Sequence, residues 1–189
     1  MIAEPLLVLL LCNFVLIGLL PLCFFRRDGR LNIRWFATGA PFFVMPAVLL
    51  LAYFEVLHQP PEIGGLSAPL AIAAVLPSVA SVALLAATVA SHRVGLALWH
   101  QDNDSPVELV TWGPYARIRH PFYTSFLSAF GAALLAFPHP LSIGCFLYAV
   151  VALIVAAHRE ERRLMASAFG RQYGDYRGAT GRFLPRLGR

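Results

Sequence analysis

Two polar segments flank the last apolar runs of the chain, GPYARIRHPFY at residues 113–123 and HREERRL at residues 158–164. Both contain side chains that can bind a charged or aromatic ligand. These are Tyr115, Arg119, His120, Tyr123, Glu160 and Glu161. Carboxylates, a histidine and arginines can form charge-assisted hydrogen bonds, and tyrosines can add ring faces. Their gathering predicts a polar site beside apolar helices.

Each of these residues also has an ordinary structural explanation when it is taken singly. Pro121 suits the first position of a helix, where its missing N–H costs nothing. Tyrosines and arginines suit the edge of a membrane span, and Glu160 can pair with Arg163 at i+3. A glutamate next to a membrane core nevertheless needs a partner or a task. The argument for a site therefore depends on the ordered set.

The composition predicts an all-α, polytopic membrane protein. Of the 189 residues, 58% are apolar and only 13% are charged, whereas an average soluble domain is about 25% charged. Several apolar runs approach the length of about 20 residues that crosses a bilayer. The pI near 9.6 could indicate nucleic acid, but the arginines flank apolar runs. We therefore expect a lipid bilayer, not a nucleic acid, as the partner. The cysteines show no metal-ligand spacing, so no metal is expected.

The apolar runs predict about five spans and one polar tail helix. The spans are expected at residues 5–25, 35–57, 66–90, 121–137 and 141–158. The third helix is expected to continue to His100 along the interface, and the short PHP link makes the last two spans a tight hairpin. The tail carries an apolar stripe at helical spacing and is predicted to form one cytoplasmic helix. The stripe consists of Leu164, Ala168, Phe169, Tyr173 and Tyr176.

The arginines predict the orientation. They fall in the loop after the first span, between the third and fourth spans, and in the tail, and the other loops contain none. By the positive-inside rule this places the N-terminus outside and the C-terminus in the cytoplasm. Residues 1–100 form a three-span membrane region, and residues 101–189 form a cofactor-binding hairpin and tail. The two are expected to make one integrated domain.

The ordered set resembles the isoprenylcysteine carboxyl methyltransferase and phospholipid methyltransferase family. It runs from Gly-Pro-Tyr through Arg-His-Pro-x-Tyr and the hairpin to Glu-Glu-x-x-Leu and TGRFLP, over about residues 100–185. Members of this family are integral-membrane enzymes that use S-adenosylmethionine. The resemblance therefore implies S-adenosylmethionine as cofactor. It also implies methyl transfer to a lipophilic or small acceptor at the cytoplasmic face.

The resemblance also implies site residues. The expected cofactor-binding residues are Val107, Glu108, Leu109, Val110, Tyr115, His120, Pro121, Phe122, Tyr123 and Glu160. His100 or Gln101 can supply a further polar group, and the substrate candidates are Arg159, Glu161 and Tyr176. No residue is assigned as a general base. The eukaryotic prenylcysteine enzymes carry an arginine about one turn before the matched glutamate, where this chain has Ala156. The acceptor therefore stays open among a lipid amine, a small thiol and other apolar molecules.

Two other functions remain open at this point. A related membrane reductase would bind NADPH, and a non-enzymatic scaffold or transport subunit would bind neither cofactor. Spans one to three lack the paired intramembrane charges that often mark an ion path. Binding of S-adenosylmethionine, of NADPH or of neither separates the three hypotheses.

Overall fold

The structure, a computed structural model, describes residues 2–18, 25, 28–60, 65–92 and 108–186. Within these ranges the chain is helical, with two isolated bridges and no strand, which confirms the all-α prediction. The elements are α1 (Glu4–Gly18), α2 (Ile33–Tyr53), α3 (Ser67–Ala90), the 3-10 turn η2 (Gly113–Ala116), α4 (Pro121–Ala136), α5 (Pro140–Met165) and α6 (Gly170–Ala179).

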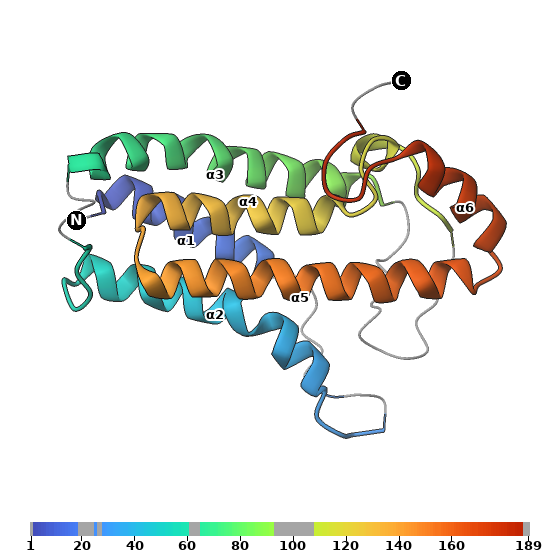
Figure 1. Cartoon of the computed structure of the whole chain (residues 1–189), viewed down its shortest axis with the longest axis horizontal. Coiled ribbons are helices and arrows are strands. Elements are labelled where there is room, and N and C mark those ends of the chain that lie inside the picture. Colours follow the sequence, from blue (N-terminus) through green and yellow to red (C-terminus); the bar gives the residue numbers. More distant parts are fainter. Residues whose placement is uncertain (1, 19–24, 26–27, 61–64, 93–107, 187–189) are drawn as a thin grey trace.

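Helices α1 to α5 run along the long axis of the molecule, and α6 lies at one end of the bundle with the loop before α4 (Figure 1). Small side chains on α4 let its neighbours approach closely, because Ala129, Ala132 and Ala133 are fully buried. Phe130 of α4 fills the centre. Its ring meets that of Phe14 edge-on at 5.2 Å and that of Phe42 at 5.0 Å. The core therefore joins α1, α2 and α4.

Hydrogen bonds between helices satisfy polar groups inside the bundle. Asn13 of α1 donates to the Ser78 hydroxyl of α3 at 2.7 Å, and Ser81 of α3 donates to the Ser125 carbonyl of α4 at 2.8 Å. An unpaired polar group would be costly in an apolar surrounding, so such bonds fix which helix faces meet. They attach α3 to both of its neighbours.

A proline inside α2 creates another such contact. Pro41 has no N–H, so the carbonyl of Ala37, four residues earlier, loses its helical partner. The Tyr148 hydroxyl of α5 donates to this carbonyl at 2.9 Å. A neighbouring helix thus supplies the hydrogen bond that the Ala37 carbonyl lost, as a backbone group in a membrane requires. The contact also sets α5 against α2.

The outer surface of the bundle is apolar. Large exposed side chains include Val15, Phe43, Leu51, Ile72, Leu76, Leu147 and Val151. Helices α2, α3 and α5 are long and apolar enough to cross a membrane, whereas the apolar helices α1 and α4 are shorter. An apolar exterior of this extent fits a lipid surrounding. The chain is therefore an integral membrane protein with at least these three candidate spans among the described residues.

The prediction of one continuous tail helix is wrong. Helix α5 continues past His158 to Met165, and α6 begins only at Gly170. The turn between them is so tight that a Cβ at Gly170 would lie 2.4 Å from the Met165 carbonyl oxygen. Tyr173 therefore points into the protein from a second helix. The predicted extension to His100 lies outside the described residues.

Candidate functional site

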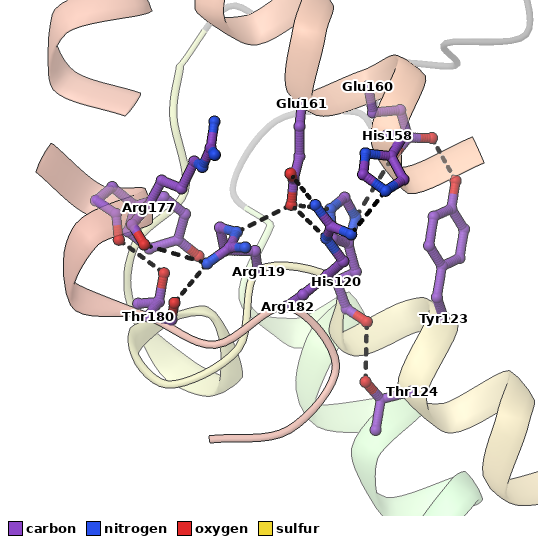
Figure 2. Close-up of polar contacts among 11 residues, drawn as sticks. Arg119, His120, Tyr123, Thr124, His158, Glu160, Glu161, Arg177, Thr180 and Arg182 are labelled. Atoms are coloured by element: carbon purple, nitrogen blue, oxygen red, sulfur yellow. Dashed lines mark hydrogen bonds and ion pairs between the residues drawn. The ribbon is translucent and has the colours of Figure 1, made fainter. Parts of the chain in front are cut away.

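The α4–α5 hairpin brings the two polar segments together. Helix α4 ends at Ala136 and α5 begins at Pro140, so the two helices run antiparallel with only three residues between them. The start of α4 then lies beside the last turns of α5. His120 and Tyr123 consequently meet Glu160 and Glu161 at the end of the bundle where α6 lies (Figures 1 and 2).

Glu161 is the centre of a buried charged cluster (Figure 2). Its side chain is 5% exposed, and its Oε1 accepts from Arg119 Nε at 3.0 Å. Arg182 binds the same carboxylate with two nitrogens, Nε to Oε1 at 3.1 Å and an Nη to Oε2 at 2.8 Å. Such paired Arg–carboxylate bonds are strong and directional. Two arginines from different parts of the chain thereby converge on one carboxylate.

His120 lies between the two glutamates. Its Nε2 is 3.3 Å from Glu161 Oε1, and its Nδ1 is 3.5 Å from Glu160 Oε2. Because both ring nitrogens face carboxylates, both should carry hydrogens, which describes the protonated imidazole. Burial opposes this charge, but hydrogen bonds and attraction from both glutamates outweigh it and raise the pKa of His120 above its ordinary value. The Tyr123 ring stacks on the imidazole, and its hydroxyl donates to Glu160 Oε1.

The segment after α6 closes the cluster from outside. Its backbone pairs with the stretch before α4: Arg119 N–H donates to the Gly181 carbonyl at 2.9 Å, and His120 N–H to the Arg182 carbonyl at 3.0 Å. A Cβ at Gly181 would lie 1.8 Å from the Leu184 carbonyl oxygen, so only glycine fits this turn. This pairing places the Arg182 side chain over Glu161.

A second group of ring-bearing residues lies at the start of α4, near the first cluster. His92, just after α3, is 3.0 Å from the Tyr115 hydroxyl through its Nε2, and its ring stacks on Phe122 with centroids 5.9 Å apart. The Tyr176 hydroxyl of α6 donates to the Tyr115 carbonyl at 2.7 Å. Gly113 permits this loop course, since its φ is +60° and a Cβ there would meet Ser91.

Burial controls the titration of this second group. It lowers the pKa of His92, against the attraction of Glu108, so this imidazole is neutral near pH 7. Burial also raises the pKa of Tyr115, together with the Tyr176 phenol and the charge of Glu160. Both ring systems therefore stay uncharged, whereas the Glu160 carboxylate lies near enough to act on Tyr115.

The structure gathers most of the predicted site residues. Tyr115, His120, Phe122, Tyr123, Glu160, Glu161 and Tyr176 all take part in the contacts described above. Val110 and Pro121 are buried, Glu108 and Leu109 are half-buried, and Arg159 is exposed. Val107, His100 and Gln101 lie outside the described residues.

Sequence reasoning missed His92 and Arg182. His92 follows a long apolar helix and belongs to no recognisable pattern. Arg182 lies within the TGRFLP segment that contributed to the resemblance, but no spacing rule predicts that the tail folds back 21 residues onto Glu161. The buried charge of Glu161 was the available signal, because a buried carboxylate needs a cation.

The structure therefore combines an apolar helical bundle with a buried polar cluster at one end of the α4–α5 hairpin. Residues 98–172 match the sequence model of the phospholipid methyltransferase family, which confirms the predicted family resemblance. The match contains His120, Tyr123 and both glutamates, so the chain is similar to this family over the stretch that forms the polar cluster. No curated protein and no solved structure matches this chain.

Proposed function

We propose that this protein transfers a methyl group from S-adenosylmethionine to a lipophilic or small acceptor. The acceptor would be reached at the cytoplasmic end of the α4–α5 hairpin. The family match supports methyl transfer, and the gathering of Tyr115, His120, Tyr123 and Glu160 at one place supports a site for a charged, ring-bearing cofactor.

An unpaired carboxylate oxygen carries this proposal. Glu108 Oε1 is buried and has no hydrogen-bond partner within the described part of the chain. A buried anionic oxygen without a donor costs free energy, so the site lacks a cationic or N–H group there. Glu108 lies near His92, which contacts Tyr115. The ammonium and sulfonium of S-adenosylmethionine fit this negative, ring-lined surrounding.

The two neighbouring glutamates have different tasks in this proposal. The Glu161 carboxylate is occupied by Arg119 and Arg182, whereas the contacts of Glu160 within the described residues are with the Tyr123 phenol and the His120 imidazole. The Glu160 side chain is also 18% exposed, against 5% for Glu161. Glu160 is therefore the carboxylate that remains able to accept a hydrogen bond from a ligand, whereas Glu161 anchors Arg119 and Arg182 next to it.

The bound cofactor would supply an electrophilic methyl group on its sulfonium. The residues of the chain then have to bind, orient and exclude water, because an in-line displacement gains most from alignment. Glu108 and Glu160 hold positive charge, and Tyr115 and Tyr123 offer ring faces. His120 keeps Glu160 in place through its Nδ1. The neutral His92 imidazole and the Tyr115 phenol stay uncharged beside the cofactor, so they do not repel its cation.

The topology is part of the proposal. Helices α1 and α4 have 15 and 16 residues, which at 1.5 Å per residue spans about 23 Å, less than a hydrocarbon core of about 30 Å. We infer that both nevertheless cross with α2, α3 and α5, because they share one core with them. On this inference, five spans and the alternating arginines would put the N-terminus outside and the tail in the cytoplasm by the positive-inside rule. Residues 1–100 and 101–189 then form one domain.

Calorimetry on the full chain in neutral detergent tests the cofactor. S-adenosylmethionine should bind to the wild type, and NADPH should not. Glu160→Gln removes the charge at constant size and should weaken binding about tenfold or more, since a charge-assisted hydrogen bond is worth roughly 1.5–3 kcal/mol. Glu55→Gln, at an exposed glutamate beyond the α2 end, is the matched control. Equal affinity in both variants would remove Glu160 from the site, and binding of NADPH alone would favour a reductase.

A further inference from the structure

A pocket beside Glu161 opens between the last turns of α5 and the segment around α6. It has a volume of about 340 Å³, and its walls include His158, Glu161, Arg162, Met165, Arg177 and Arg182. None of its arginines belongs to the predicted cofactor set. The side chains of α5 that line it recur at helical spacing, so they form one face of that helix.

The pocket has more positive charge than its one carboxylate balances. Arg182 uses Nε and one Nη on Glu161, which Arg119 also neutralises. Arg162 and Arg177 are exposed, and neither guanidinium has a hydrogen-bond or ion-pair partner in the described ranges of the chain. Two unpaired guanidinium groups facing one cavity favour an anion with several oxygens.

His158 adds a directed donor to this wall. Its Nε2 lies 3.0 Å from an Nη of Arg182. Because a guanidinium only donates, this Nε2 must accept, so the ring hydrogen is on Nδ1. The remaining N–H can donate to a ligand oxygen. Met165 supplies the apolar part of the same wall.

The depth of the pocket identifies the kind of anion. Helix α5 begins at Pro140 and has 26 residues. A hydrocarbon core of about 30 Å takes about 20 residues at 1.5 Å each, so α5 leaves it near Arg159. His158, Arg162 and Met165 then lie at the level of the lipid headgroups. Basic groups at this level attract the phosphates of lipids.

We propose that this pocket binds the phosphate group of a phospholipid, with Arg162 and Arg177 on its oxygens. The site is separate from the cofactor cluster, and Glu161 and Arg182 form the wall between them. Since binding is expected without cofactor, the proposal stands independently of methyl transfer.

Thermal unfolding of the full chain in neutral detergent tests this proposal with three probes. Dioctanoyl phosphatidylglycerol should raise Tm in a saturable way, and the rise should shrink in 0.5 M salt because charge is screened. Dioctanoylglycerol has the same chains without the phosphate and should give no comparable rise. An equal effect of both lipids would overturn a phosphate site. An equal effect of inorganic phosphate at the same concentration would overturn the lipid as its source.

Matched variants locate the binding. The double variant Arg162→Gln, Arg177→Gln should weaken the apparent Kd for phosphatidylglycerol about tenfold or more. Arg171→Gln removes the same charge from an exposed position of α6 outside the pocket and should bind like the wild type. If the double variant does not fold, the two single variants should each show a smaller loss. Wild-type affinity in the double variant, or in both single variants, excludes the pocket.

Discussion

The buried cluster around Glu161 yields the sharpest stability prediction. Glu161→Gln keeps the size of the side chain but removes the charge that binds Arg119, Arg182 and His120. Arg119 is only 9% exposed, so its charge would stay buried without a carboxylate. Arg182 is 29% exposed and can turn toward water. Removing one partner of a buried ion pair costs about 3–5 kcal/mol, and the freedom of Arg182 favours the lower end.

The expected loss is therefore about 3 kcal/mol, which lowers Tm by roughly 6–12 °C for a chain of this length. Thermal unfolding without ligand, in one detergent and at one pH, measures it. Glu160→Gln is the internal control. The Glu160 carboxylate faces a phenol and an imidazole and is 18% exposed, so this variant should lose about 1 kcal/mol of unfolding free energy. If the two neighbouring variants unfold at the same temperature, Glu161 is not the centre of the cluster.

Three further predictions follow from named positions. A cysteine at Gly65 should react with an impermeant reagent in intact cells while one at Gly178 stays protected, and the opposite pattern would invert the proposed orientation. The folded state raises the pKa of His120 above 6.5, so its stabilisation is complete below that pH and is lost as pH rises through the raised pKa. The Tm advantage of wild type over His120→Asn should therefore shrink as pH rises above 6.5, and a constant difference would contradict the charged imidazole. Gly181→Ala should lower Tm by several degrees because its Cβ meets the Leu184 carbonyl oxygen, whereas Gly178→Ala, with open space around it, should not.

The apolar runs predicted the long helices well because one rule governs them. A backbone in lipid must satisfy its own hydrogen bonds, so each long apolar run becomes a helix. The predicted third span, 66–90, and the observed α3, Ser67–Ala90, differ by one residue. The PHP link likewise allowed only a tight hairpin. Pro121 begins α4 as predicted, and α5 begins at Pro140, one residue before the predicted fifth span.

The tail was predicted less well because no single rule governs it. Its apolar stripe continues across residues 166–169, so periodicity alone could not show the break before Gly170. The break depends on a close backbone approach, and the return of residues 180–183 depends on pairing with the stretch before α4. Both are tertiary effects. For the same reason the sequence could name Glu161 as a candidate without finding its partner Arg182.

The adjacent glutamates show why the two halves of the site need each other. An α-helix turns by about 100° per residue, so Glu160 and Glu161 point in different directions from the end of α5. Glu161 points to the stretch before α4 and to Arg182, and Glu160 points to Tyr123. His120 contacts both. Fixing Glu161 with two arginines therefore orients the imidazole, and the imidazole then orients Glu160. A less buried carboxylate held by a buried one can bind a cation without losing its position, which is the arrangement that alignment of a charged cofactor requires.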